Sequence, residues 1–268
     1  EDRIGDILGR LVGPAAEHGR DWMYRHLGRL VDRYIATNER DFDVLEGREL
    51  VPSDKLEMVI GGRGIDVDQF NPDDEELEDR ASIRRTSGLP ESWRLVVGYA
   101  GSFEPNREGV DVVRMLDRIA SRRRDVGWLF SAAAETDEEP LLSDRLRRGR
   151  AAVGPSSDDP RYYRAIDLLV HPRTDAESAE VLMKAQAMRV PVVAYDSAPN
   201  ASVVANRQTG RLVPSGDLDA LVEVVEGLID NPKRARDYGR RARARSAQRF
   251  DRENVDRQLL RLYDTVLE

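Results

Sequence analysis

The chain has 268 residues, of which 42 are basic and 50 acidic, and its net charge of −8 argues against a protein that binds duplex nucleic acid through a broad cationic face. It contains no cysteine, which excludes disulfides and thiolate metal sites, and its three histidines are too widely spaced to indicate a metal site. No apolar run approaches the roughly 18 residues of a transmembrane helix, and no signal peptide is visible, so we expect a soluble, cytoplasmic protein.

The N-terminal part of the chain predicts a set of short elements. The sequence begins at Glu1 without a methionine, which suggests a processed piece of something longer. Apolar residues three and four positions apart predict a short helix over Ile4–Leu11, which Gly13 and Pro14 end. In chain order, the elements expected next are a helix over Asp21–Leu30, a strand over Tyr34–Thr37, a helix over Asn38–Leu45, a strand over Leu56–Ile60 and a turn over Gly61–Gly64.

An acidic run over Asp73–Asp79 then precedes the basic pair Arg84 and Arg85, an order that suits the macrodipole of a solvated helix. From Trp93 onward, short apolar runs alternate with helical segments, which is typical of βαβ units and a parallel sheet. The strands expected are Leu95–Tyr99, Trp128–Ala132, Ala151–Gly154, Leu168–His171, Val190–Tyr195 and Gly210–Val213. The helices expected between them are Gly109–Arg122, Glu139–Arg147, Pro160–Ala165, Glu177–Met188 and Ala201–Asn206.

The apolar runs within Leu168–His171 and Val190–Tyr195 are uninterrupted, as expected for strands that helices cover on both faces. After Asp217 the pattern is helical, over Leu218–Ile229, Pro232–Arg249 and Arg252–Leu267. The last helix carries an apolar stripe at steps of four, three and four residues, which needs a partner surface. Its members are Val255, Leu259, Leu262 and Val266.

Ligands of open parallel sheets bind beyond the carboxyl ends of the strands, so the loops after Tyr99, His171 and Tyr195 are the places to seek a site. The first loop contains a glycine turn at Gly101 and Ser102, followed by Arg107 and a helix. Backbone N–H groups and an arginine in this arrangement suit phosphate oxygens, although a strand-to-helix turn without a ligand explains the pattern about as well.

The second loop places polar residues directly before a helix. Asp175, Glu177 or Ser178 could cap that helix, which accounts for at least one of them. A remaining carboxylate could accept hydrogen bonds from a hydroxylated ligand. Because carboxylates repel phosphate, we expect such a group at the sugar end of a ligand.

The run from Val190 to Asp217 resembles the nucleotide-sugar-binding domain of the retaining glycosyltransferases of family four, which have the GT-B fold. It consists of a strand, a short helix, Thr209-Gly210, a second strand, Pro214-Ser215-Gly216-Asp217 and a long helix. Further segments similar to landmarks of that family are Asp32–Asn38, Arg63–Asp66, Phe70–Pro72, Val97–Gly101, Tyr162–Asp167, and Phe250 with the helix ending at Leu262-Tyr263.

The resemblance implies an α/β fold with a Rossmann-like parallel sheet and only a partial N-terminal segment. Residues 1–72 would be a remnant of the acceptor domain and the linker, residues 73–250 the donor-binding domain, and residues 251–268 a helix crossing back to the first domain. The implied activity is transfer of a hexose, with retained configuration, from a UDP- or GDP-sugar to an unknown glycan, lipid or small molecule. No cofactor, metal or nucleic acid is implied, and the sequence says nothing about peripheral membrane association.

The resemblance also assigns roles to single residues. Asp175 and Glu177 would face the sugar as catalytic groups. The residues that would bind the donor nucleotide are Gly101, Ser102 and Arg107 on the phosphates, Ser178 and Ala179 at the helix start, and Lys184 on the ribose or phosphate side.

The chain departs from the family pattern in this same region. The family has an arginine where Ser102 stands, and two glutamates, with seven residues between them, where Ala176 and Lys184 stand. Its Phe-Gly pair is replaced by Ser178 and Ala179. An alternative is therefore a degenerate, non-catalytic module that binds a nucleotide weakly or serves as a partner surface. A sugar-nucleotide epimerase shares the architecture, but its signatures are not visible.

Overall fold

The chain forms two compact units in a computed structural model that describes residues 14–101, 107–131, 151–175 and 178–267. Unit 1 comprises Glu1–Gly64 with Arg252–Glu268, and unit 2 comprises Ile65–Asp251. The chain enters and leaves unit 2 at neighbouring points, because Ile65 pairs with Asp251 and its N–H donates to the carbonyl of Phe250 at 2.7 Å. The predicted helices Ile4–Leu11 and Glu139–Arg147 lie outside the described residues.

Unit 1 contains the short elements expected near the N-terminus. Strands β1 and β2 pair in parallel, with Tyr34 opposite Leu56. A small apolar cluster that includes Ala36, Leu45 and Leu56 lies among them. The bounds are α2 Pro14–Leu30, β1 Tyr34–Ala36, α3 Glu39–Gly47, the 3₁₀ turn η1 Ser53–Lys55, β2 Leu56–Met58 and α12 Arg252–Leu267.

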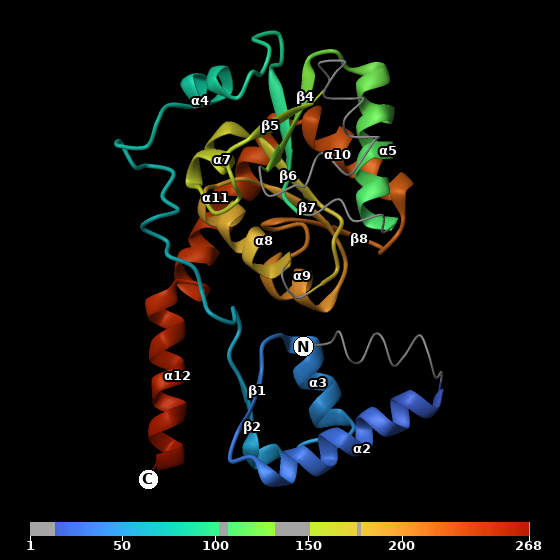
Figure 1. The fold of residues 1–268 in the computed structure, drawn as a ribbon, viewed down its shortest axis with the longest axis vertical. Helices are drawn as coiled ribbons and strands as arrows, with labels where there is room; N and C mark the ends of the chain where they lie inside the picture. The colour runs from blue at the N-terminus through green and yellow to red at the C-terminus, as the bar shows by residue number, and fades with distance from the viewer. Residues whose placement is uncertain (1–13, 102–106, 132–150, 176–177, 268) are drawn as a thin grey trace. The chain divides into compact units, whose positions relative to one another are not determined.

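Unit 2 is built on a six-stranded sheet whose neighbouring strands are all parallel, in the order β5-β4-β3-β6-β7-β8. Helices cover both faces, with α5 and α10 on one side and α7 and α8 on the other (Figure 1). The strands are β3 Leu95–Tyr99, β4 Val126–Ser131, β5 Ala152–Gly154, β6 Leu168–His171, β7 Val192–Tyr195 and β8 Gly210–Val213. The helices are α4 Arg80–Thr86, α5 Arg107–Arg122, α7 Pro160–Ala165, α8 Ser178–Ala187, α9 Ala198–Val203, α10 Leu218–Ile229 and α11 Pro232–Arg249. The expected parallel α/β fold is confirmed.

The central strand β3 shows why both faces must be apolar. Val97 and Tyr99 point into the core formed with α5 and α10. Gly98, between them, faces α7 so closely that an added Cβ would lie 2.5 Å from Cδ1 of Ile166. On β4, the ring of Trp93 occupies the space that a side chain at Gly127 would need. Glycine at these two positions therefore lets α7 and Trp93 pack directly on the sheet.

Several predicted helices begin elsewhere, and the helix expected over Asp21–Leu30 is α2, which already starts at Pro14. The acidic run Asp73–Asp79 is not helical, because Asp79 is the N-cap of α4 and its Oδ1 accepts from the N–H groups of Ala81 and Ser82 at 2.9 and 3.0 Å. The helix expected over Ala201–Asn206 is α9, which starts three residues earlier, at Ala198, after Ser197. Proline is favoured in a first helical turn, and Pro199 occupies that position here.

Asp167 holds helix α4 against the rest of unit 2. The carboxylate accepts from Nη1 of Arg80 at 2.7 Å, from Nη2 of Arg84 at 2.6 Å and from the N–H of Val96 at 2.8 Å. Arg84 is largely buried, with 17% of its side chain exposed. Asp167 thus forms ion pairs with two guanidinium groups at the amino end of the sheet, just before β6.

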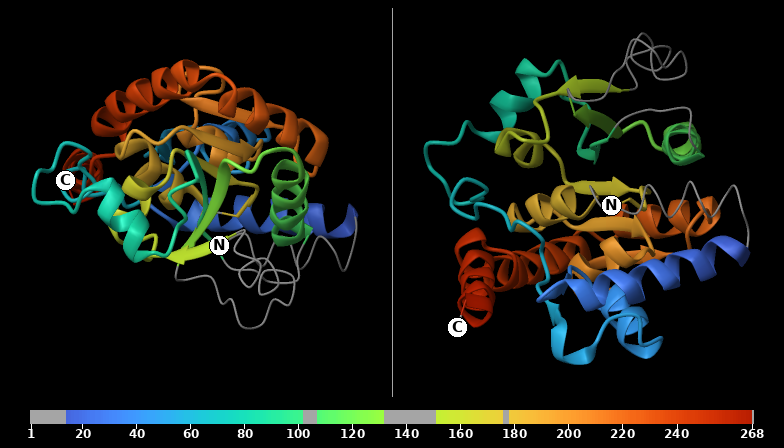
Figure 2. Two further views of the ribbon diagram at one scale, coloured as in Figure 1. Left: turned by 90° about the horizontal axis from the view of Figure 1, so that it is seen from above. Right: turned by 60° about the horizontal axis from the view of Figure 1, so that its bottom comes forward.

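Helix α11 runs along the outer surface of unit 2, beside α8 and α10 (Figure 2). It approaches the end of α8 so closely that any Cβ at Gly239 would collide with the carbonyl oxygen of Arg189. Arg189 has a φ of 59°, in the left-handed region that usually favours glycine. The carboxylate of Asp73 binds its guanidinium through two hydrogen bonds of 2.6 Å.

Candidate functional site

The candidate site lies where β3, β6 and β7 end, at one edge of the sheet. Because the strands are parallel, their carboxyl ends meet there. The described residues at this rim come from the three loops that the sequence singles out. They are Gly101 after β3, Arg173 and Asp175 after β6, and Asn200 in α9 after β7.

Gly101 and Arg173 bring the backbone of one loop against the side chain of the next. A Cβ added to Gly101 would lie 2.9 Å from Cδ of Arg173 and 2.9 Å from Oη of Tyr99, and its φ of 156° is unfavourable for other residues. A glycine is therefore needed for this approach. The side chain of Arg173, 15% exposed, therefore packs with its aliphatic part against this glycine.

Asp175 joins that guanidinium to the start of α8. Its Oδ2 accepts from Nε of Arg173 at 2.7 Å, and its Oδ1 accepts from the N–H and the Oγ of Ser178 at 3.0 and 3.1 Å. Burial alone would raise the pKa of Asp175, but the charge of Arg173 and these hydrogen bonds outweigh it, so the pKa lies below its usual range. Asp175 is thus an ionised cap of α8, as the capping alternative anticipated.

Asn200 and Tyr195 fix the third loop to the second loop and to α5. Nδ2 of Asn200 donates to the carbonyl of Arg173 at 2.7 Å and to that of Tyr195 at 2.8 Å. Oη of Tyr195 donates to Oδ2 of Asp111, a buried carboxylate in the first turns of α5, at 2.9 Å. These bonds join the ends of β6 and β7 to α5, so the rim is preorganised.

His171, the last residue of β6, lies beneath the rim. It is 1% exposed, and its ring stacks on Tyr99 with centroids 6.4 Å apart. Neither ring nitrogen has a hydrogen-bond partner of ordinary geometry among the described residues. Burial lowers the pKa of His171 from 6.5 to about 4, while nearby Asp175 favours protonation and Arg173 opposes it. The imidazole is therefore neutral at physiological pH.

Lys184 lies away from this rim. Helix α8 runs back from the rim, and Lys184 is six residues beyond Ser178, a rise of about 9 Å. Its Nζ binds Oδ1 of Asp158 at 2.7 Å and Oε1 of Glu180 at 2.6 Å, and it lies 5.5 Å from the ring centroid of Phe70. Burial would lower the pKa of Lys184, but the two carboxylates outweigh it and raise the pKa.

The structure places only part of the predicted residue set. It brings Gly101, Asp175 and Ser178 together at the rim, with Ala179 next in α8, and leaves Lys184 apart. Ser102 and Glu177 lie outside the described residues, and only the backbone of Arg107, the first residue of α5, is described.

Arg173 is the rim residue to which the sequence argument gave no role. The sequence could have indicated it, because Arg173 stands two residues after the end of β6, within the loop already singled out.

The described residues contain no helix long and apolar enough to cross a membrane. Within those same ranges, no group of three or more histidine, aspartate or glutamate side chains could hold a metal ion.

Comparison with known proteins identifies relatives of the sheet domain. The sequence model of a family described as "Glycosyl transferases group 1" matches residues 94–231, more than half of the chain. A capsular polysaccharide biosynthesis glycosyltransferase of Staphylococcus aureus is 24% identical over 209 residues, which cover 76% of this chain and 53% of that protein. The phosphatidyl-myo-inositol mannosyltransferase of Mycolicibacterium smegmatis is 29% identical over 222 residues, covering 81% and 54%. The chain thus spans about half the length of these relatives.

Solved structures share the fold. HepE of Anabaena, in complex with UDP and glucose, superposes with a TM-score of 0.72 at 19% identity, covering 93% of this chain and 68% of that one. Sucrose-phosphate synthase of Thermosynechococcus elongatus gives a TM-score of 0.72 at 19% identity, covering 98% and 66%. At this identity the likeness establishes the fold alone.

Proposed function

The chain belongs to the group 1 glycosyl transferases, and from that premise we propose that unit 2 binds a nucleotide-sugar donor at the rim of β3, β6 and β7. The proposed reaction moves a hexose from a UDP- or GDP-sugar to a glycan, lipid or small-molecule acceptor, with retained configuration. The observation that carries the proposal is the side chain of Arg173, which packs against the glycine turn at Gly101 while its guanidinium is fixed at the rim by Asp175. A cytoplasmic location stays a prediction.

Arg173 supplies the charge that the substitution at Ser102 removes. When a sugar leaves a nucleotide diphosphate, negative charge develops on the departing phosphate oxygen, and a fixed cation stabilises it. Arg173 comes from the loop after β6 instead of the loop after β3, yet it lies against Gly101. Backbone N–H groups at the start of α8 would add further donors to the diphosphate.

The carboxylates are assigned to the sugar end. Asp175 is ionised, 38% exposed and fixed by Arg173 and Ser178, so it would accept hydrogen bonds from sugar hydroxyls without moving. Glu177, two residues further on, would assist it as the second catalytic group. Ser178 and Ala179 would lie below the diphosphate, and Gly101, Ser102 and Arg107 beside it. Lys184 would act on the ribose side only by giving up one of its ion pairs.

Support from known proteins is of two kinds. A neighbour in structure, Anabaena HepE, has been solved with UDP and with UDP-glucose, which favours a nucleotide-sugar at this rim. The mannosyltransferase relative of M. smegmatis is named for phosphatidyl-myo-inositol, so lipid-linked acceptors are among those to test.

The ion pairs of Lys184 and the capping role of Asp175 favour the second candidate, a module that binds nucleotide without transfer.

Calorimetric titration of UDP, GDP and their hexose conjugates tests donor binding. We expect one nucleotide to bind saturably, and Arg173→Gln to weaken it about ten- to a hundred-fold, the effect of losing one charge-assisted hydrogen bond. Arg85→Gln, which removes an exposed arginine from α4, is the matched control and should leave affinity unchanged. If no nucleotide binds, the donor site proposed here is wrong.

Transfer is tested separately from binding. Incubation of the chain with the hexose conjugate that binds, followed by proton NMR of the released or transferred sugar, reports both turnover and anomeric configuration. Retained configuration supports the proposed reaction. Saturable binding without any turnover would favour the non-catalytic module.

A further inference from the structure

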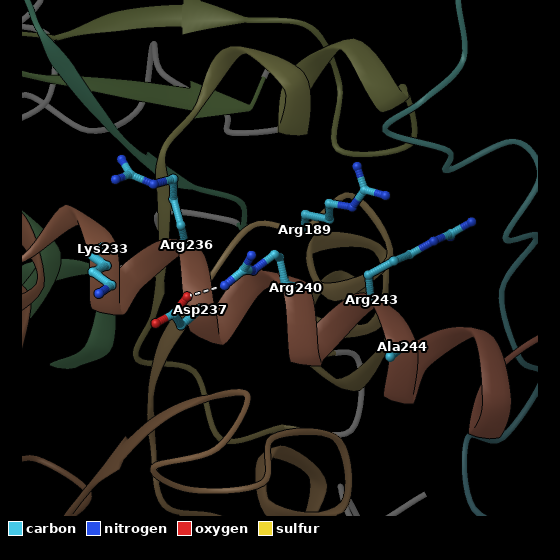
Figure 3. Close-up of a pocket in the computed structure, with 7 residues that line it drawn as sticks. All are labelled: Arg189, Lys233, Arg236, Asp237, Arg240, Arg243 and Ala244. Atoms are coloured by element: carbon cyan, nitrogen blue, oxygen red, sulfur yellow. Dashed lines mark hydrogen bonds and ion pairs between the residues drawn. The ribbon is translucent and has the colours of Figure 1, made fainter.

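Helix α11 carries a row of basic side chains that the proposed function does not use. Lys233, Arg236, Arg240 and Arg243 recur at steps of three, four and three residues, so they lie on one face of the helix over about 15 Å. Arg189, at the end of α8, extends the row sideways (Figure 3). These five residues, the basic stripe, line an open groove of about 960 Å³ together with Asp237 and Ala244.

The charge of this helix contrasts with that of the chain. The whole chain has a net charge of −8, yet α11 alone contains eight basic residues and a single acidic one. Five of the eight are exposed, and three of those belong to the basic stripe: Lys233, Arg236 and Arg240. The molecule therefore has a localised positive surface on an otherwise acidic chain.

The basic stripe is only partly neutralised from within. Arg189 pairs with Asp73, and Arg240 pairs with Asp237 at 2.5 Å. Arg243 donates to two backbone carbonyls, which carry no net charge. Lys233 and Arg236 make no ion pair with any residue that the structure describes. The three exposed cations, Lys233, Arg236 and Arg240, thus have only Asp237 as a carboxylate among the residues that line the groove, and a positive surplus remains there for an external anion.

The crowding of these cations also affects Arg243. Its partial burial is the first cause that lowers its pKa, and the charge of Arg189 is the second, while the carboxylates of Asp73, Asp68 and Asp251 oppose both. These carboxylates offset part of the repulsion, so the surplus of positive charge lies at the exposed part of the stripe.

We propose that the basic stripe docks unit 2 onto the anionic headgroups of a lipid bilayer. A cluster of four to eight basic residues along an amphipathic helix is typical of surfaces that bind acidic lipids. Lys233, Arg236 and Arg240 of the stripe are exposed, so their charges can meet headgroup phosphates directly. The large apolar side chains that are exposed among the described residues all lie in unit 1, so contact through α11 is electrostatic and inserts nothing.

A nucleic acid fits these observations less well. Single strands bind to exposed aromatic side chains on which bases stack, and α11 offers none, because its one aromatic residue, Tyr238, is 2% exposed. Duplexes require a broad cationic face, whereas the net charge here is −8. A bilayer can be bound through the one basic face of α11. The stripe is also separate from the donor rim, since Arg189 lies at the opposite end of α8.

Vesicle co-sedimentation of the full chain tests the proposal. Vesicles of phosphatidylcholine alone are compared with vesicles of phosphatidylcholine and phosphatidylglycerol, at low and high salt. The test variant replaces Lys233, Arg236 and Arg240 by glutamine, which keeps the helical propensity. The matched control replaces three exposed arginines elsewhere in unit 2, Arg85, Arg94 and Arg124, by glutamine and so removes the same charge. Circular dichroism confirms that both variants are folded.

The expected result is binding to anionic vesicles only, lost at high salt. Affinity should fall about five-fold for each charge removed, or about a hundred-fold in the stripe variant, and little in the control. Equal losses in both variants, or equal binding to neutral vesicles, would overturn the proposal. So would tighter binding to a duplex oligonucleotide than to anionic vesicles at the same salt concentration. None of these outcomes depends on whether a donor nucleotide binds.

Discussion

His171 should make the stability of unit 2 depend on pH in a defined window. The unfolded chain takes up a proton at this residue as the pH falls below 6.5, whereas the folded chain does so only near pH 4. Because the unfolded state binds more protons at this residue between these values, the contribution of His171 lowers the stability as the pH falls from 6.5 to about 4, and this contribution levels off below. The pKa difference corresponds to a loss of about 3 kcal/mol at most.

The substitution His171→Phe isolates this effect. Phenylalanine keeps an aromatic ring against Tyr99 and cannot be protonated. Between the same pH values, we therefore expect the free energy of unfolding of the variant to fall by about 3 kcal/mol less than that of the wild type. Urea unfolding followed by circular dichroism, repeated from about pH 7 to about pH 4, gives the free energy of unfolding for each. Parallel curves for the wild type and His171→Phe would refute the assignment of a neutral, buried imidazole.

Four further substitutions test other contacts. Asp167→Ala leaves two guanidinium groups unpaired and should lower the free energy of unfolding in urea by about 3 kcal/mol. Asp219→Ala, which breaks an exposed pair with Arg118, should cost under about 1 kcal/mol, and equal losses would contradict the role of Asp167. Gly127→Val must displace Trp93 and should lower the free energy of unfolding by at least about 1–3 kcal/mol in the same assay. An unchanged free energy of unfolding would show that the ring can move freely. Arg173→Lys keeps the charge without the planar fork; we expect a nucleotide affinity between those of wild type and Arg173→Gln, and an affinity no better than that of Arg173→Gln would argue that charge alone is insufficient.

The sheet could be predicted from the sequence because its strands must be apolar on both faces. Leu168–His171 and Gly210–Val213 have the predicted bounds, since each run is closed by a proline or a polar residue. The start of α9 was missed for a local reason. Ser197 and Pro199 together define the first turn, and that capping pattern outweighs the apolar spacing that suggested a later start.

The candidate site could be located, but its side-chain partners could not. Strand ends predict that Gly101 and Asp175 lie at one edge, and they do. Which cation meets which carboxylate depends on loop paths that carry no periodic signal. Asp175 pairs with Arg173, two residues away, whereas Lys184 reaches Asp158, 26 residues earlier in the chain. The second pairing exists only because α7 and α8 pack together.

Trp93, the tryptophan that covers Gly127, allows the unfolding of unit 2 to be followed by intrinsic fluorescence. Trp93 and Trp128, the two tryptophans of unit 2, are at most 9% exposed, while Trp22 in unit 1 is 67% exposed. Buried indoles emit at shorter wavelengths than hydrated ones, so the emission spectrum contains a separate signal from each unit. Variants with tryptophan removed from one unit would therefore show, without any added dye, whether the two units melt together or in sequence.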